Sequence, residues 1–313
     1  MRPRYLWIIQ AIVLLGLLAA LYHLQFQSQT LSQNPILIHH PLKITIPQTI
    51  HQLFISTPGD PGSTFSPDRH STSWLQSGWK VEYWRESSCL DLARELDDAD
   101  NNATGSYAST FQALPAPILK SDFCRYLILF ARGGIYNDLD VQLLRPLPWP
   151  VMGVATDGED TLPPPGVVVG LEGDAATTGL PRSPQFVQWT MASVPGHPVF
   201  RDVLRSIVDR TAQFVPTQTA GSDVDIDVMG WTGPSAWTDA VLGYLRCDDE
   251  QIQQLRDLRE IVRIRDVVVL PRRAFAVLQG EDQSAPDVLV KHYFEGSWKG
   301  CAREWLRWLW RGC

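Results

Sequence analysis

The chain has 313 residues, of which 44% are hydrophobic and 19% are charged. This length allows one α/β catalytic domain of about 250 residues with small appendages, and the composition excludes a disordered chain. The formal net charge of −7 argues against a nucleic-acid-binding surface, so we predict no nucleic-acid partner.

The N-terminal segment predicts a membrane anchor. Residues 1–4 are basic and residues 5–22 carry no charge, and eighteen helical residues span about 27 Å, close to one hydrocarbon core. We predict a cytosolic tail over 1–4, an uncleaved type II transmembrane anchor over 5–22 and a luminal stem over 23–45. A cleaved signal peptide is the alternative. Both place the domain in the secretory pathway, where the sequon at Asn102 becomes a glycosylation site.

The rest of the chain alternates strand patterns with helix patterns. Strand-like apolar runs occupy residues 49–56, 80–85, 135–144, 167–171, 266–270 and 288–292. Helical spacing occupies residues 88–97, 117–131, 184–193, 198–213 and 234–246. This alternation predicts a sheet covered on both faces, in a single catalytic domain over residues 46–300. In the Trp/Arg-rich C-terminal tail, 301–313, residues 302–311 predict a basic helix that either lies at a membrane interface or docks on the domain.

The five cysteines give a weak signal. They contain no CxxC pair, so a zinc site has little support. Cys124 lies within an apolar helical pattern and is predicted to be a small buried hydrophobic residue. A disulfide between Cys301 and Cys313 rests on their proximity in sequence alone.

Paired aspartates predict a metal site. The spacing D-x-D occurs four times, and context favours Asp138 and Asp140, which follow a helix, Gly133-Gly134 and a short strand. Residues i and i+2 of an extended backbone point the same way, and α/β proteins bind ligands at the carboxyl edge of parallel strands. Such a pair suits Mg²⁺ or Mn²⁺ with a diphosphate completing the coordination shell.

A second acidic segment is a rival metal site. Asp223, Asp225 and Asp227 alternate with apolar residues, as on a strand with one acidic face. No basic or glycine-rich element precedes this segment, so we favour Asp138 and Asp140.

The helix before the favoured pair adds two charges. Asp122 and Arg125 are three residues apart and share a face of an otherwise apolar helix. A carboxylate accepts hydrogen bonds from ribose hydroxyls, and a guanidinium donates a bidentate pair of hydrogen bonds to a phosphate. We therefore predict a nucleotide pocket at these two residues. The alternative is an ordinary i,i+3 ion pair.

Segments 114–122, 125–136 and 138–140 together resemble family 32 glycosyltransferases. Segments 227–240 and 290–299 narrow the resemblance to the fungal initiation-specific α-1,6-mannosyltransferases. The resemblance implies a GT-A fold, a Rossmann-like domain that binds a nucleotide sugar. It also implies Golgi membrane residence, GDP-mannose as donor and Mn²⁺ (or Mg²⁺) as metal. It implies transfer of mannose to an N-glycan acceptor in α-1,6 linkage with retained configuration, and membership of a mannosyltransferase complex is a further expectation.

The resemblance also assigns roles to residues. Asp138 and Asp140 become the catalytic metal and diphosphate ligands. Donor-binding roles fall on Asp122, Arg125, Tyr136 and Lys120.

Four further residues are weaker candidates. His292 ends a strand and is either an additional metal or phosphate ligand or a structural histidine. Trp231 and Thr232 precede a helix whose N-terminus could face a sugar, and Thr232 is predicted to cap that helix. Glu172 follows the strand at 167–171 and is predicted to contact the acceptor.

Two other functions stay open. One is a family 32 mannosyltransferase that acts on a lipid or mannan-chain acceptor. The other is a non-catalytic glycan-binding subunit of a mannosyltransferase complex. The intact pair of Asp138 and Asp140 argues against the second, because loss of these carboxylates would be its expected sign.

Overall fold

The computed structural model describes residues 45–55, 70–99, 107–152, 163–174, 179–214 and 227–294, all within one compact unit. Within these residues, no helix is both long and apolar enough to cross a bilayer. Several predictions lie outside the described residues: the anchor at 5–22, the sequon at Asn102, the aspartates 223 and 225, and the C-terminal tail.

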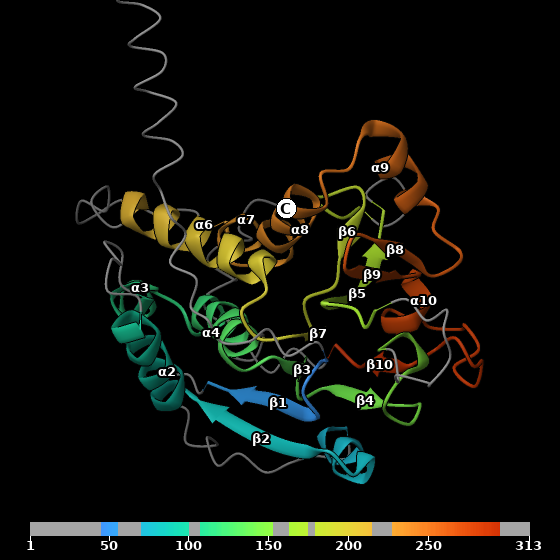
Figure 1. Cartoon of the computed structure of the whole chain (residues 1–313), viewed down its shortest axis with the longest axis horizontal. Coiled ribbons are helices and arrows are strands. Elements are labelled where there is room, and N and C mark those ends of the chain that lie inside the picture. Colours follow the sequence, from blue (N-terminus) through green and yellow to red (C-terminus); the bar gives the residue numbers. More distant parts are fainter. Residues whose placement is uncertain are drawn as a thin grey trace, which may run out of the picture. The chain divides into compact units, whose positions relative to one another are not determined.

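A mixed sheet forms the centre of the domain (Figure 1). Its strand order is β2 (Lys80–Arg85), β1 (Thr49–Phe54), β3 (Gly134–Asn137), β7 (Thr190–Ser193), β5 (Val167–Gly173), β9 (Val267–Leu270) and β8 (Val262–Ile264), with β6 (Gln185–Phe186) beside β5. Strand β1 runs parallel to β2 and β3, and β5 runs parallel to β9. Strand β7 is antiparallel to both of its neighbours. The predicted α/β sheet is therefore confirmed.

A separate two-stranded antiparallel ribbon pairs β4 (Val141–Leu143) with β10 (Val290–His292). The helices are α2 (Glu86–Ala99), α3 (Tyr107–Ala113), α4 (Pro117–Arg132), α6 (Pro198–Phe214), α7 (Val228–Trp231), α8 (Pro234–Leu245), α9 (Asp249–Arg256) and α10 (Arg272–Phe275), with short 3-10 turns at Ser71–Ser77 and Pro150–Met152. Four of the five predicted helices, which correspond to α2, α4, α6 and α8, agree with the structure within two residues at each end, and the short helices α3, α7, α9 and α10 were not predicted.

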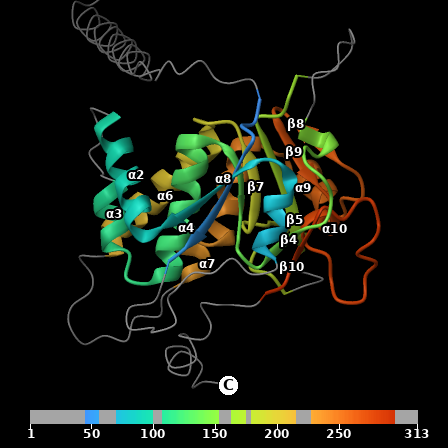
Figure 2. The same ribbon diagram turned by 90° about the horizontal axis from the view of Figure 1, so that it is seen from below.

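The sheet separates two hydrophobic cores. Alternate residues of β5 point to opposite faces: Val167 and Val169 enter a helix-side core with α2, α3, α4, α6 and α8, whereas Val168 enters a ribbon-side core with β4 and β10. Figure 2 shows α2, α3, α4 and α6 gathered on one side of the strands. The site described below lies where these two sides meet at the end of β3.

Helix α4 is positioned by its sequence at both ends. Pro117 stands in the first turn, where a missing N–H costs nothing. Its buried apolar side chains each contribute about 1.5–3 kcal/mol relative to exposure. Gly133 and Gly134 end the helix with φ values of 63° and 91°. A Cβ atom on Gly134 would lie 2.4 Å from the Thr49 carbonyl oxygen, so glycine allows β3 to approach β1.

Two element predictions are wrong. Residues 184–193 form β6 and β7 instead of a helix. Strand β7 lies between β3 and β5 and is buried on both faces, so it lacks the polar–apolar alternation that marks a strand. Residues 135–144 form two strands, because the chain turns at Asp138, whose carbonyl oxygen accepts a hydrogen bond from the Val141 N–H.

The prediction for Cys124 is wrong in its chemistry. The residue is fully buried, as expected, but it forms a disulfide with Cys89. The bond joins α2 to α4 across a Cα–Cα distance of 5.7 Å. Cys89 lies 35 residues earlier on another helix, and a sequence pattern does not reveal that pairing.

Candidate donor and metal site

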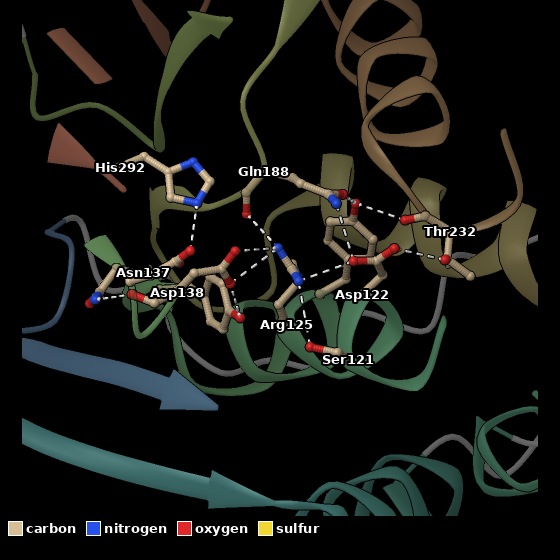
Figure 3. A network of polar contacts seen from close by, with 11 residues as sticks. Ser121, Asp122, Arg125, Asn137, Asp138, Gln188, Thr232 and His292 are labelled. Carbon is tan, nitrogen blue, oxygen red and sulfur yellow. Dashed lines mark hydrogen bonds and ion pairs between the residues drawn. The ribbon is translucent and has the colours of Figure 1, made fainter. Parts of the chain in front are cut away.

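Three potential metal ligands meet at the end of β3. Asp138 and Asp140 lie in the turn between β3 and β4, and His292 ends β10. One ligand atom from each lies within 4.8 Å of the other two, and His292 Nε2 is 3.2 Å from Asp140 Oδ2 (Figure 3). The β4–β10 ribbon causes this meeting, because it pairs His292 with Val141, the residue after Asp140.

These three side chains fit a hard divalent cation. Carboxylate oxygens are preferred ligands of Mg²⁺ and Mn²⁺, and an imidazole nitrogen suits Mn²⁺. Burial raises the pKa of Asp138. The positive charge of Arg125 lowers this pKa, and the negative charge of Asp140 raises it. A bound cation would relieve this repulsion between the two carboxylates.

Arg125 lies directly behind the acidic turn. Its guanidinium is almost fully buried, with Nη1 3.4 Å from Asp138 Oδ1 and donating to the Gln188 carbonyl oxygen at 3.1 Å. It also stacks over the ring of Tyr136, whose hydroxyl donates to Asp138 Oδ1 at 2.6 Å. Arg125 and Tyr136 therefore both hold the carboxylate of Asp138 in place, and Figure 3 shows Arg125 between Asp138 and Asp122.

Asp122 anchors the arginine from behind. It is completely buried, and its Oδ1 lies 3.0 Å from Arg125 Nη2. The Thr232 hydroxyl donates to Asp122 Oδ2 at 2.9 Å and the Gln188 side-chain amide donates to Oδ1 at 3.1 Å. Burial raises the pKa of Asp122 to about 7, with the Arg125 charge opposing it. The predicted pair is thus an internal network, and its contact with a nucleotide stays a prediction.

The capping role predicted for Thr232 is wrong. Helix α8 begins after Gly233, which has no side chain to cap it, and the Thr232 hydroxyl is bonded to Asp122 instead. Trp231 is buried and donates its indole N–H to Thr211. Its position in the helix-side core lends no support to the predicted acceptor contact.

Lys120 and Asp227 face away from the acidic turn. The Lys120 ammonium lies 2.6 Å from Glu86 and over the ring of Phe111, on the side of α2 and α3. Asp227 accepts a hydrogen bond from the Gly230 N–H and so caps α7. Of the predicted donor-binding residues, the structure brings Asp122, Arg125 and Tyr136 to the site and leaves Lys120 outside.

Glu172 lies on the ribbon side of the site. It follows the buried part of β5, and Gln185 donates to its Oε2 at 2.7 Å. Burial raises the pKa of Glu172, the Gln185 hydrogen bond opposes this, and the His292 charge also lowers it.

Sequence analysis missed Gln188 and Trp189, because both fell in the segment predicted as a helix. Gln188 bonds to Asp122 and accepts from the Tyr126 hydroxyl at 2.8 Å. The Trp189 ring packs 4.6 Å from the His292 ring. Both residues directly precede the strand Thr190–Ser193, so a strand assignment there would have placed them at the end of that strand.

Comparison with known proteins confirms the resemblance found in the sequence. Residues 67–159 match the family described as glycosyltransferase sugar-binding region containing DXD motif. This region includes Asp122, Arg125, Asp138 and Asp140.

Curated relatives from three fungi, Schizosaccharomyces pombe, Candida albicans and Saccharomyces cerevisiae, carry the name initiation-specific alpha-1,6-mannosyltransferase. The protein of Schizosaccharomyces pombe is 32% identical over 239 residues, which cover 70% of this chain and 59% of that protein. The protein of Candida albicans is 32% identical over 223 residues, which cover 61% of this chain and 57% of that protein. The chain thus spans less than two thirds of the length of either of these two relatives. Among solved structures, the PaToxG glycosyltransferase aligns with a TM-score of 0.42 and 16% identity, over 67% of this chain and 73% of that one.

Proposed function

We propose that this chain is a metal-dependent mannosyltransferase of the GT-A class. The match of residues 67–159 to the glycosyltransferase sugar-binding region containing DXD motif supports this proposal. The enzyme transfers mannose from GDP-mannose to an N-glycan core, in α-1,6 linkage and with retained configuration. The observation that carries the proposal is the meeting of Asp138, Asp140 and His292 in front of the buried Arg125. The mannosyltransferase relatives support the choice of donor sugar and acceptor.

The transfer exchanges one bond at the anomeric carbon of mannose. The bond to the diphosphate oxygen breaks, and its electron pair leaves with GDP. The acceptor hydroxyl oxygen forms the new bond and releases its proton. Asp138, Asp140 and His292 would hold a divalent cation, which would neutralise the charge that develops on the diphosphate.

The residues of the chain orient this site. Arg125 holds Asp138 in place and adds a fixed positive charge behind the acidic turn. Asp122, Gln188 and Thr232 keep the guanidinium from rotating, since each is within hydrogen-bonding distance of another member of the network. A site held this firmly needs little rearrangement when charge develops in the transition state.

We place the enzyme in the Golgi, as a type II membrane protein with its catalytic domain in the lumen. The apolar segment at 5–22 supports an anchor. The disulfide between Cys89 and Cys124 supports an oxidising compartment, because disulfides are rare in cytosolic proteins.

The test uses the full chain, purified in detergent, with GDP-mannose and a mannose-rich N-glycan core. We expect transfer with Mn²⁺ and none with a chelator. Asp138→Asn and Asp140→Asn should each lower the rate at least about 100-fold while the protein stays folded. The matched control is Asp91→Asn, an exposed aspartate of α2 paired with Arg94, which should transfer normally.

Three outcomes separate the proposal from its alternatives. Transfer that continues in the chelator would contradict the metal role. Transfer to a lipid or a mannan chain, but not to the glycan core, would change the acceptor. No transfer to any of the three would favour a non-catalytic glycan-binding subunit.

A further inference from the structure

Aromatic rings enclose the metal-ligand histidine. The His292 ring lies 4.6 Å from the ring of Trp189 and 4.0 Å from that of Phe294. Trp189 is buried, and its indole N–H donates to the Phe275 carbonyl oxygen. Phe294 is 55% exposed, so it presents an aromatic surface to solvent beside the proposed reaction centre. Isolated exposed apolar residues are common, and the position of this one is what requires an explanation.

The backbone holds Phe294 in that position. The Tyr293 N–H donates to the Asp140 carbonyl oxygen at 2.9 Å, and the Tyr293 hydroxyl donates to Gln142 at 2.7 Å. These bonds tie the end of β10 to the acidic turn. Phe294 itself has a φ of 51°, a left-handed conformation that is unfavourable for a bulky residue. Strained residues of this kind persist at ligand-binding positions.

A carboxylate lies on the same side of the sheet. Glu172 lies in β5 beside the bulge between Leu171 and Gly173, next to the segment 185–189, whose Val187 and Trp189 belong to the ribbon-side core. Gln185 holds one of its oxygens, Oε2, at 2.7 Å. Gln185 belongs to the same segment as Trp189, whose ring centre lies 5.6 Å from that of Phe294, so this segment joins Glu172 to the aromatic rings.

The ribbon side is separate from the side that holds the arginine network. Asp122 and Arg125 project from α4, which packs in the helix-side core. Trp189 belongs to the ribbon-side core, and His292 follows Val290 of the same core. The acidic turn therefore has a basic, hydrogen-bonding flank and an aromatic, acidic flank.

We propose that Phe294 and Glu172 form the subsite for the acceptor sugar. The aromatic ring stacks on the C–H face of a pyranose, and the Glu172 carboxylate accepts a hydrogen bond from one of its hydroxyls. An aromatic face beside a carboxylate suits a neutral sugar and repels a phosphate, which separates this flank from the diphosphate of the donor. The inference rests on the proposed glycosyltransferase function and adds the residues that select the acceptor.

The test compares Michaelis constants for the two substrates. Initial rates are measured with the full chain, Mn²⁺, GDP-mannose and the mannose-rich N-glycan core, varying one substrate at a time. Phe294→Ala should raise the KM for the glycan about tenfold, which is the effect of losing one central contact of about 1.4 kcal/mol. Glu172→Gln should raise the same constant. Phe294→Tyr, which keeps the ring, should bind the glycan as wild type does.

The control is Ile261→Ala, which removes an equally exposed apolar side chain elsewhere (56%) and should change neither constant. An unchanged glycan KM in Phe294→Ala would overturn the subsite. The subsite would also be overturned if Phe294→Ala needed more Mn²⁺ or had a higher KM for GDP-mannose while its KM for the glycan stayed unchanged. In that case Phe294 would act only by supporting His292. If wild type itself transfers no mannose, the proposed function fails first, and the two failures are thus distinguished.

Discussion

Removal of the Cys89–Cys124 disulfide should destabilise the entire domain. The two cysteines are 35 residues apart in sequence, and both are fully buried. A crosslink of that span removes about 13 cal/mol/K of chain entropy from the unfolded state, or about 4 kcal/mol at 25 °C. Domains of this kind are stable by about 5–15 kcal/mol, so the loss is a large fraction of the total.

The assay is urea denaturation of the full chain, followed by tryptophan fluorescence. The double variant Cys89→Ala/Cys124→Ala should unfold at a clearly lower urea concentration than wild type, and reductant should lower the wild-type midpoint to a similar value. Cys247→Ala is the control, because Cys247 is the free cysteine within the described part of the chain. If reductant leaves the wild-type midpoint unchanged, the two thiols are not bonded and the entropy estimate is void.

Two further predictions concern buried and charged groups. Thr232→Val leaves the buried Asp122 carboxylate without one donor and should cost about 1–3 kcal/mol in urea unfolding. Ser235→Ala, the control, removes a buried hydroxyl without a partner among the described residues and should cost little. The pKa of Glu281 is lowered from 4.5 to about 2, chiefly by its hydrogen bond from Arg272. The difference in the free energy of unfolding between wild type and Glu281→Gln should therefore be largest above pH 4.5 and should shrink as the pH falls toward 2. A difference that does not change with pH would contradict this prediction.

Local sequence signals predicted the elements that carry the site. Helix α4 has Pro117 in its first turn and a glycine pair after its last, and both signals act within a few residues of the chain. The acidic pair was found because its strand and glycines adjoin it in sequence. In each case the physical cause of the structure lies inside the window that a sequence pattern spans.

Contacts between distant segments were not predicted. The Thr232 hydroxyl reaches Asp122 across 110 residues of sequence, and its neighbour Gly233 takes the capping position that was expected for Thr232. Strand β7 was taken for a helix because its insertion between β3 and β5 buries both of its faces. Nothing in these segments alone specifies which partner they meet, since packing of the whole sheet decides it.

The charge of the site supports the proposed cation. Asp122, Asp138 and Asp140 carry three negative charges when ionised, and Arg125 carries one positive charge. The guanidinium is shared between Asp122 and Asp138, at 3.0 and 3.4 Å. The neutral form of His292 offers a lone pair but no charge. Excess negative charge in a partly buried site is unfavourable unless a cation joins it. A divalent ion would neutralise the carboxylates and would also attract the negative charge of a diphosphate. The proposed metal dependence therefore rests on the whole network and not on the spacing of two aspartates.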